Sequence, residues 1–216
     1  MTDNDVLNRW AGPKRVCDVV TAAVLLVVSA PLMLLVAVLI RCEGSGPVLY
    51  RQLRPGLHGE PFQIVKFRSM RPDPELERLG TDGDHVRITR LGRILRTSSV
   101  DELPNLVNVL RGEMSIIGPR PLLMSYLDLY SAHQARRHEV RPGMTGLAQV
   151  NGRNDTDWTT RFDLDVEYVE RCSLRLDAQI LVATVWTVVS RRGVSKRGHA
   201  TMVTFRGDDT ESFATR

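Results

Sequence analysis

One uncharged apolar run constrains the fold of this chain more than any other feature. Residues 19–40 read VVTAAVLLVVSAPLMLLVAVLI and contain no charged side chain. As an α-helix the run would be about 33 Å long, which matches the hydrocarbon thickness of a bilayer. The mixed polar sequence before it and the absence of a small-residue cleavage site after it disfavour a secretory signal peptide. The run therefore predicts a membrane anchor, and the core helix of a soluble domain is the less favoured alternative.

Pro31 lies in the interior of this run and predicts a kink near residues 29–31, because proline lacks the N–H that a helix interior uses. Basic residues flank both ends of the run: Lys14 and Arg15 before it, and Arg41, Arg51 and Arg54 after it. Positive flanks are retained on the cytoplasmic side of a membrane. We therefore predict a re-entrant helix-break-helix whose two arms each reach roughly 16 Å, about one leaflet. A kinked single span is the alternative.

The rest of the chain predicts one cytoplasmic domain. Its net charge of +4 lies entirely after the apolar run, because basic and acidic residues balance within residues 1–18. The three cysteines lack metal-ligand spacing and suit a reducing compartment. The sequence thus divides into residues 1–42, an N-terminal segment with the re-entrant membrane hairpin, and residues 43–216, one cytoplasmic unit.

Periodicity predicts the elements of this unit. Strand-like runs at 48–53 and 62–67, joined by the Pro- and Gly-containing segment 54–59, indicate a β-hairpin. Helical patterns begin near Asp101 and at Leu122, and residues 158–192 are mostly helical in pattern. The predicted fold class is mainly α with a short β-hairpin (α+β), with the membrane helices and amphipathic interfacial helices around a cytoplasmic domain.

One predicted helix is strongly basic. Arginines recur every third residue, with apolar residues filling the intervening face: Arg87, Arg90, Arg93 and Arg96. A solvated charged face is the plain explanation. Next to a membrane anchor, this pattern favours contact with lipid headgroups or with a phosphate substrate.

The adjacent carboxylates Asp101 and Glu102 are the strongest chemical candidates. At the positive end of a helix and beside the arginines, they could share a site with a phosphate and a divalent cation. Ser99 and Glu102 also fit an S-x-x-E capping box, and spacing alone favours this cap. Further phosphate-binding candidates are Lys66, Arg68 and Arg120, although a single cation is more often a surface residue.

Five ordered motifs resemble those of the bacterial sugar transferase family, the monotopic phosphoglycosyl transferases. They are Lys14-Arg15-x-x-Asp18, Lys66-Phe67-Arg68-Ser69-Met70, Ser99-Val100-Asp101-Glu102-Leu103-Pro104-Asn105, Gly118-Pro119-Arg120-Pro121, and Arg141-Pro142-Gly143-x-Thr145-Gly146-Leu147-Ala148-Gln149-Val150-Asn151-Gly152. The resemblance extends from about Lys14 to Phe205. It departs at the membrane break, where the family commonly has Ser-Pro and this chain has Ala30 before Pro31.

The resemblance implies a reaction. Such enzymes transfer a sugar 1-phosphate from a UDP-sugar to undecaprenyl phosphate at the cytoplasmic face of the bacterial inner membrane and release UMP. A covalent aspartyl-phosphosugar intermediate is implied, as is a role in the first membrane step of glycan or glycoprotein biosynthesis. The short form and the tail after Gly193 are most similar to members that use an N-acetylated hexosamine such as N,N′-diacetylbacillosamine.

The resemblance also implies roles for individual residues. Asp101 would be the nucleophile and a Mg²⁺ ligand, and Glu102 would assist the metal or deprotonate the acceptor. The candidates for phosphate and nucleotide contacts are Lys66, Arg96, Arg120 and Arg153. Asp18 and Asp165 would join the site to the anchor through ion pairs with Lys14 or Arg15, and Pro31 would form the membrane bend.

The implied partners are the UDP-sugar, undecaprenyl phosphate, membrane lipids and downstream glycosyltransferases. The sequence does not decide whether the chain forms a homodimer. No nucleic-acid partner is expected. The alternative is a membrane-anchored, non-catalytic lipid-binding or scaffold protein, which would leave Asp101 and Glu102 without a purpose. A polytopic one-step transferase is disfavoured because it requires many spans and the sequence shows one apolar run.

Overall fold

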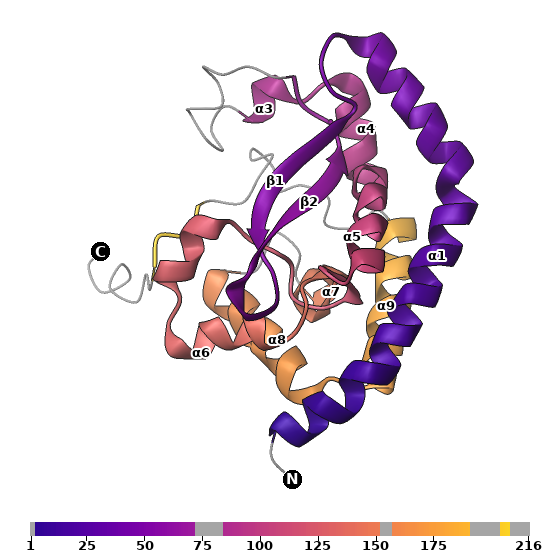
Figure 1. Ribbon diagram of the computed structural model, residues 1–216. Coiled ribbons are helices and arrows are strands. Elements are labelled where there is room, and N and C mark those ends of the chain that lie inside the picture. Colours follow the sequence, from indigo (N-terminus) through magenta and orange to yellow (C-terminus); the bar gives the residue numbers. More distant parts are fainter. Residues whose placement is uncertain (1–2, 72–83, 152–156, 191–203, 208–216) are drawn as a thin grey trace.

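The computed structural model describes residues 3–71, 84–151, 157–190 and 204–207. One long helix, α1 (Asp3–Glu43), curves along one side of a globular body formed by the later elements (Figure 1). The helix has 41 residues and continues through both Pro13 and Pro31. The predicted helix-break-helix is therefore wrong in its local form, because the backbone bends without interruption.

A side-chain hydrogen bond close to Pro31 favours the bend of α1. The Ser29 hydroxyl donates to the Leu25 carbonyl at 2.6 Å, one turn earlier. Such back-bonding accompanies bending in helices. Ser29 therefore serves the bend from one residue earlier than a Ser-Pro pair would place it. The carbonyl that loses its N–H donor because of Pro31 is that of Val27, and the Ser29 hydroxyl does not replace this donor.

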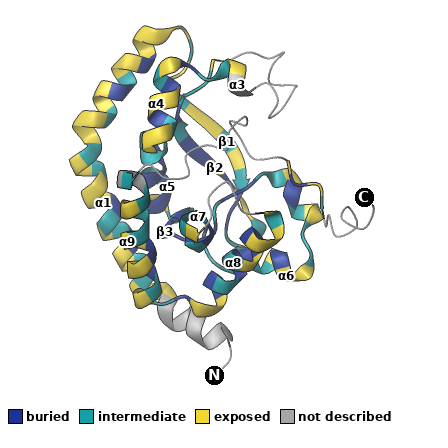
Figure 2. Cartoon of the chain, turned by 180° about the vertical axis from the view of Figure 1, so that it is seen from behind, coloured by how far each residue is buried: buried dark blue, intermediate teal, exposed yellow. Residues whose placement is uncertain are grey.

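Both ends of α1 pack on the same globular body. Near the N-terminal end, Ala22 is fully buried against a cluster that includes Leu106, Val109 and Met114. Near the C-terminal end, Val36 and Ile40 pack with Phe67 and Leu95 in a second cluster. The middle of the helix exposes apolar side chains instead, including Val27 at 76% and Val28 at 72% exposure. Figure 2 shows this outer face of α1 as mostly exposed.

Among the described helices, α1 alone is long and apolar enough to cross a membrane. Helix α9 (Leu174–Ser190) lies beside the N-terminal half of α1 in both views (Figures 1 and 2). It exposes further large apolar side chains, among them Val182 and Trp186. We call the large exposed apolar residues of the two helices the apolar flank: Val16, Val20, Val24, Leu25, Val27, Val28, Leu32, Leu34, Leu35, Val38, Leu39, Leu174, Leu181, Val182, Val185 and Trp186.

The predicted β-hairpin is confirmed. Strands β1 (Leu49–Pro55) and β2 (Pro61–Phe67) pair antiparallel, in register from Leu49 opposite Phe67 to Pro55 opposite Pro61. A 3₁₀ turn at Leu57–Gly59 connects them. Strand β2 turns Phe62, Ile64 and Phe67 into the interior, so its backbone is held firmly against the helices behind it.

The predicted basic helix is divided into α3 (Asp84–Arg87) and α4 (Arg90–Ser98). Between them Ile88 forms an antiparallel bridge with Met70, which takes the backbone out of helical geometry. Thr89 then begins α4, because its hydroxyl accepts a hydrogen bond from the Gly92 N–H at 2.8 Å. The arginines of this segment therefore do not share one continuous stripe.

The segment around the two carboxylates is a 3₁₀ helix, Val100–Asn105, followed by α5 (Leu106–Arg111). Ser99 precedes it with a φ of 58° and makes no side-chain capping bond. The predicted capping box is therefore wrong. Gly112, with a φ of 86°, ends α5 in the left-handed conformation that favours glycine.

Two short strands that the sequence did not predict, β3 (Ser115–Ile117) and β4 (Gly143–Thr145), pair in parallel. Their backbones approach so closely that a Cβ on Gly143 would lie 2.1 Å from the Gly118 nitrogen. The helix predicted from Leu122 is a 3₁₀ helix at Met124–Leu129, followed by α6 (Ala132–Ala135) and a 3₁₀ helix at Arg136–Glu139. Helices α7 (Leu147–Asn151), α8 (Trp158–Arg171) and α9 complete the body.

Candidate functional site

The structure brings three of the predicted site residues into direct contact. The Glu102 carboxylate accepts hydrogen bonds from Lys66 Nζ at 2.7 Å and from Arg120 Nη2 at 2.5 Å. Arg120 Nη1 lies 3.4 Å from the second oxygen of the same carboxylate. These residues come from β2, from the 3₁₀ helix and from the loop after β3. Three distant parts of the sequence therefore meet at one carboxylate.

Asn108 of α5 fixes the position of Lys66. Its side chain accepts the Val65 N–H at 3.2 Å and donates to the Gln63 carbonyl at 2.7 Å and to Glu113 at 2.7 Å. Asn108 is fully buried, so the amide acts as a bracket between α5 and β2. This bracket places Lys66, the next residue of β2, opposite Glu102.

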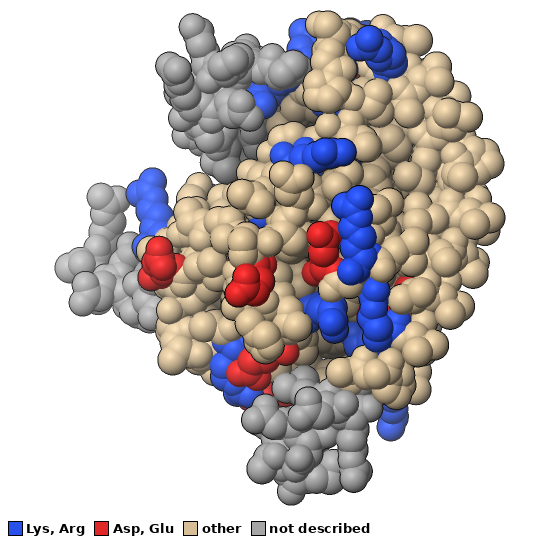
Figure 3. Space-filling view, viewed as in Figure 1, with Lys and Arg blue, Asp and Glu red and all other residues tan. Residues whose placement is uncertain are grey.

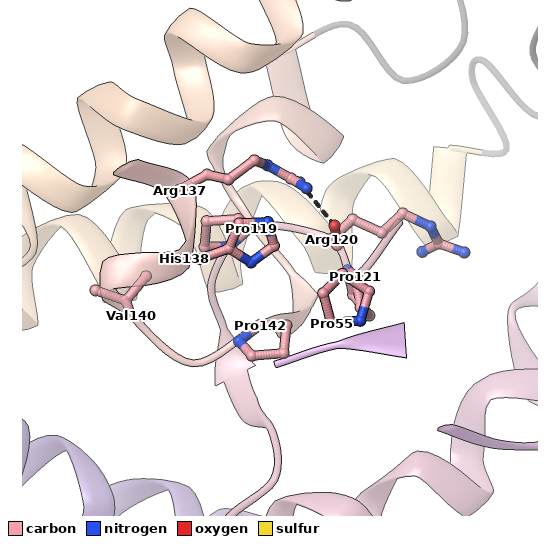
Figure 4. Close-up of a pocket in the computed structure, with 8 residues that line it drawn as sticks. All are labelled: Pro55, Pro119, Arg120, Pro121, Arg137, His138, Val140 and Pro142. Atoms are coloured by element: carbon pink, nitrogen blue, oxygen red, sulfur yellow. Dashed lines mark hydrogen bonds between the residues drawn. The ribbon is translucent and has the colours of Figure 1, made fainter. Parts of the chain in front are cut away.

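The loop that carries Arg120 is fixed by main-chain bonds. The Gly118 N–H donates to the Thr145 carbonyl at 2.8 Å, and the Gly143 N–H donates to the Pro119 carbonyl at 2.9 Å. Arg137 donates to the Arg120 carbonyl at 2.7 Å (Figure 4). These bonds fix the main chain on both sides of Arg120.

A small pocket lies behind this loop (Figure 4). It has no room for a water molecule and is lined by Pro55, Pro119, Arg120, Pro121, Arg137, His138, Val140 and Pro142. Figure 4 shows the Arg120 guanidinium extending away from it. Burial and the neighbouring Arg137 lower the pKa of His138 to about 4, so its imidazole is neutral near pH 7. We interpret the pocket as packing behind the site and not as the site itself.

Asp101 has a different environment from its neighbour. Burial and the adjacent Glu102 raise the pKa of the Asp101 carboxyl to about 6, and Lys66, Arg120 and Arg96 oppose this rise. Among the described residues, its side chain forms no hydrogen bond and no salt bridge. Asp101 is therefore a carboxylate without a partner, held close to three cations.

Glu102 is strongly acidic. Burial raises the pKa of its carboxyl, but Arg120 and Lys66 lower it by more, and the result is a pKa well below the ordinary value. Glu102 therefore stays ionised and is a poor proton acceptor at neutral pH. Its contacts favour the positioning of two cations over the predicted deprotonation of an acceptor.

The remaining predicted substrate-binding residues have different placements. Arg96 stands in the last turn of α4 and contributes to the charge around Asp101. Arg153 lies outside the described residues. Arg68 is not a phosphate ligand in this geometry, because its guanidinium donates to the carbonyls of Ile40, Gly44 and Ser45 at the end of α1.

The N-terminal motif joins α1 to the body. Lys14 pairs with Asp177 at 2.8 Å and lies 3.8 Å from Asp18. Asp18 accepts the Ser115 hydroxyl and the Ile116 N–H, each at 3.0 Å, and so holds the start of β3. Arg15 caps α5 by donating to carbonyl groups, Val109 at 2.5 Å and Leu110 at 2.8 Å.

The predicted partner of Asp165 is wrong. Its carboxylate pairs with Arg137, with Nη2 at 2.7 Å and Nε at 3.0 Å, and both side chains are almost completely buried. Lys14 and Arg15 bind elsewhere. Through Arg137, Asp165 supports the main chain of Arg120 and not the membrane helix.

Two arginines near the site were not predicted. Arg54 at the end of β1 has its pKa lowered by burial and by the charge of Arg120. Arg161 of α8 is 8% exposed, and burial followed by Arg120 lowers its pKa to about 10. The sequence carried one usable signal: Arg161 precedes Phe162 and lies four residues before Asp165 on the buried face of α8. Arg54 was expected only as one of the basic residues that follow the apolar run, and no sequence pattern related it to the site.

Charges gather across the middle of the face seen in Figure 3, whereas the flank formed by α1 is almost entirely uncharged. In the part of the chain that the structure describes, no group of three or more His, Cys, Asp or Glu side chains could hold a metal. Mg²⁺ often binds through one or two carboxylates together with substrate phosphates. The unpartnered carboxylate of Asp101 fits such an ion, which would arrive with a diphosphate.

Comparisons with known proteins agree on one family. The family model for bacterial sugar transferases matches residues 8–191. The chain is 46% identical over 194 residues to "Uncharacterized sugar transferase EpsL" of Bacillus subtilis (strain 168), covering 90% of this chain and 96% of that protein. It is 48% identical over 185 residues to a Caulobacter vibrioides protein named "UDP-glucose:undecaprenyl-phosphate glucose-1-phosphate transferase", covering 80% of this chain and 68% of that protein. A Klebsiella pneumoniae protein of the same name is 38% identical over 80% of this chain, which spans 39% of its length.

Proposed function

We propose that this chain, which belongs to the bacterial sugar transferase family, transfers a sugar 1-phosphate from a UDP-sugar to undecaprenyl phosphate and releases UMP. The names of the Caulobacter and Klebsiella relatives support this reaction. The observation that carries the proposal is the Asp101 carboxylate, which has no partner while its neighbour Glu102 binds Lys66 and Arg120. A free carboxylate beside oriented cations suits nucleophilic attack on a phosphorus atom.

In the first step an Asp101 oxygen attacks the phosphorus that carries the sugar. A phosphorus–oxygen bond to Asp101 forms, and the bond between the two phosphates of the UDP-sugar breaks. UMP departs with the electron pair of that bond. The protein then holds the sugar phosphate as a mixed anhydride on Asp101.

In the second step an oxygen of the lipid phosphate attacks the same phosphorus. The bond to Asp101 breaks and regenerates the carboxylate, and the product is a polyprenyl diphosphate sugar. Such a product is the expected substrate of downstream glycosyltransferases. The two steps exchange one phosphoanhydride linkage for another, so no oxidant or reductant is needed.

The chain's own cations act on the charge of the diphosphate. Lys66 and Arg120 are oriented by Glu102, so their remaining donors can bind phosphate oxygens without prior rearrangement. Arg96 adds positive charge next to Asp101. Mg²⁺, held by Asp101 and by substrate phosphates, would supply further charge neutralisation for the departing UMP.

The placement of α1 supports catalysis at a membrane surface. Lys14 and Asp18 near one end, and Ile40 at the other, contact the same globular body. A helix that crossed the bilayer would carry one of these ends to the opposite side and break its contacts. We infer that α1 enters one leaflet by its curved apolar face and returns, with the body on the cytoplasmic face of the inner membrane.

The sugar is the finer part of the proposal. The names of the relatives favour UDP-glucose, whereas the sequence resemblance implied an N-acetylated hexosamine such as N,N′-diacetylbacillosamine. Both share the uridine diphosphate that the cations would bind. A panel of UDP-sugars, with undecaprenyl phosphate and Mg²⁺, compares them directly by the rate of UMP release.

The deciding variant in this assay is Asp101→Asn. It should lower UMP release at least a thousandfold, because the amide cannot form the mixed anhydride. The control is Asp163→Asn, since Asp163 is an exposed carboxylate of α8 whose partner is His133. Turnover by Asp101→Asn at the wild-type rate, or no UMP release by the wild type from any UDP-sugar, would contradict the proposal.

A further inference from the structure

Phe205 is a buried residue in a segment, residues 204–207, that contains neither helix nor strand. Its side chain is 4% exposed, whereas its neighbours Thr204 and Arg206 are exposed. Figure 1 shows the segment in yellow, near the C-terminus. The match to the family model ends at residue 191, so Phe205 lies outside the matched residues. Its burial depends on contacts within this chain.

Four aromatic rings surround Phe205, with centroids 5.0–6.0 Å from its own: Tyr126, Tyr130, Trp158 and Phe162. The ring of Tyr130 is stacked on Phe205, and that of Phe162 lies edge-on to it. The Phe205 N–H also donates to the Tyr126 hydroxyl at 3.1 Å. Ring pairs of this geometry stabilise a core beyond the burial of their area. Side chain and main chain therefore hold Phe205 in one position.

Two of these rings, Tyr130 and Phe162, also cover the guanidinium of Arg137. The guanidinium carbon lies 5.6 Å from the centroid of each ring, within the range of a cation–π contact. The Tyr130 hydroxyl accepts a further hydrogen bond from Arg137 Nη1 at 3.1 Å. Phe205 thus contacts both of the rings that lie over Arg137.

Arg137 connects this aromatic cluster to the site. Its Nη2 donates to the main-chain carbonyl of Arg120 at 2.7 Å (Figure 4), and the Arg120 guanidinium binds Glu102. Arg137 and its partner Asp165 are almost completely buried. A buried ion pair stabilises the fold only when its geometry is well maintained. The rings that fix Arg137 therefore also affect the position of Arg120.

We propose that Phe205 is a positioning residue, which acts on Arg120 through the rings that hold Arg137. Without the phenyl group, Tyr130 and Phe162 would border a cavity, and a core relaxes partly into such a space. Arg137 would then lose its fixed contacts, and the Arg120 guanidinium would no longer be oriented for a phosphate. This inference rests on the proposed function, because it concerns the role of Arg120 in that reaction.

Steady-state kinetics tests the role in turnover. Phe205→Ala should lower kcat/KM for the UDP-sugar about tenfold or more, the loss expected when one charge-assisted hydrogen bond is misplaced. The control is Thr204→Ala, because Thr204 is the exposed neighbour of Phe205. If Phe205→Ala does not fold, Phe205→Leu keeps most of the apolar volume without the aromatic ring. Wild-type kcat/KM of the folded variant would overturn the proposal.

A double-mutant cycle separates the positioning of Arg120 from general support of the fold. Arg120→Lys keeps the charge but removes the guanidinium whose orientation Phe205 is proposed to fix. In this background Phe205→Ala should cost about threefold or less, because the group on which it acts is already missing. A loss of about tenfold in both backgrounds would show that the two residues act independently, and it would overturn the proposal.

Hydrogen exchange tests the connection without substrate or turnover. The Gly143 N–H donates to the carbonyl of Pro119, the residue before Arg120, and so reports on this loop. Phe205→Ala should raise the exchange rate of this amide more than that of the Val65 N–H, which is bonded to a side chain of α5. Equal increases for the two amides, or no change in either, would overturn the proposal.

The same measurement distinguishes the two possible failures. If the wild type releases no UMP from any UDP-sugar, the proposed function fails. The exchange of the Gly143 amide then still decides whether Phe205 acts on the Arg120 loop. If the wild type releases UMP and Phe205→Ala changes neither turnover nor this exchange, the role of Phe205 fails and the proposed function stands.

Discussion

Asp101 and Glu102 are neighbours in sequence, yet their carboxyl groups titrate in opposite directions. Glu102 faces Lys66 and Arg120, and their charges outweigh the cost of its burial. Asp101 has no direct partner, so burial and the negative charge of Glu102 dominate and raise its pKa to about 6. The environment thus gives the two carboxyl groups different roles. Glu102 stays ionised and orients the cations, and Asp101 is the more basic carboxylate.

This difference predicts the pH dependence of turnover. Attack requires ionised Asp101, so kcat/KM for the UDP-sugar should fall as the pH drops below about 6, the pKa in the free protein. Glu102→Gln should move this acid limb to lower pH, because it removes a like charge and releases Lys66 and Arg120 to face Asp101. Initial rates measured between pH 4.5 and 8 give the acid limb of the wild type and that of Glu102→Gln. A wild-type limb near pH 4, or a limb unmoved by Glu102→Gln, would contradict this account.

The same pKa predicts that Asp101→Asn stabilises the fold. The pKa of Asp101 is higher in the folded chain, about 6, than its ordinary value of 3.8. The folded state therefore holds the proton more tightly, and ionisation above pH 6 destabilises it. Asp101→Asn should raise the free energy of unfolding by about 1–3 kcal/mol at pH 8 without Mg²⁺, and this gain should vanish below about pH 4. Urea unfolding in detergent at both pH values tests this, with Asp163→Asn as control, and an equal effect at both would be inconsistent with it.

At the residue scale, ordered motifs identified the carboxylate pair, Lys66 and Arg120. They could not show that Glu102 would be the common partner of these cations, because the contact joins residues 36 and 18 positions apart. The capping-box prediction failed for the same reason: local spacing favoured a bond to the backbone, and long-range charges outcompeted it. Arg54 was missed because one arginine in an alternating strand resembles any surface cation.

At the scale of elements, Asn108 connects α5 to β2 and so controls the hairpin that carries Lys66. Asn108→Ala would leave the Val65 N–H and the Gln63 carbonyl without their partners in the interior. We expect a loss of about 2–4 kcal/mol in the free energy of unfolding. Chemical unfolding in detergent measures it. Asn151→Ala is the control, because the exposed Asn151 makes one bond, to Leu147 within its own helix, and equal losses for the two variants would refute the role given to Asn108.

Elements with strong periodicity were predictable, and elements defined by pairing were not. The hairpin and the helices α8 and α9 followed from alternation and apolar faces. The strands β3 and β4 were not predicted, because each has only three residues and their parallel pairing joins distant segments of the sequence. The break predicted at Pro31 did not occur, because α1 continues through the proline as one curved helix (Figure 1).

At the scale of the whole molecule, the apolar flank and the charged middle separate two tasks. The flank exposes large apolar side chains over α1 and α9, and Trp186 is 66% exposed. Tryptophan is typical of the membrane interface. The charged site lies on the body between the hairpin and α8, where a lipid phosphate and a soluble nucleotide could meet. The composition of the whole chain is mildly basic and does not show that the apolar flank and the charged site are separate regions.

This division predicts how substitutions affect membrane binding. Val27 and Val86 are both well exposed, at 76% and 60%, but only Val27 belongs to the apolar flank. A charge in the middle of a membrane helix costs about 2.5–3.5 kcal/mol. Val27→Asp should therefore lower the fraction bound to phospholipid vesicles in flotation assays, and Val86→Asp should not. An equal effect of the two substitutions would argue against the flank as the membrane surface.

The central claim is that Asp101 forms a covalent bond to the transferred phosphate, and trapping the intermediate tests it most directly. The full chain is mixed with UDP-sugar labelled with ³²P in the sugar-linked phosphate, with Mg²⁺ and without undecaprenyl phosphate, and is then denatured. We predict label on the wild-type chain, its loss on later addition of the lipid acceptor before denaturation, and no label on Asp101→Asn. Turnover without any labelled protein, or label that persists in Asp101→Asn, would contradict the account.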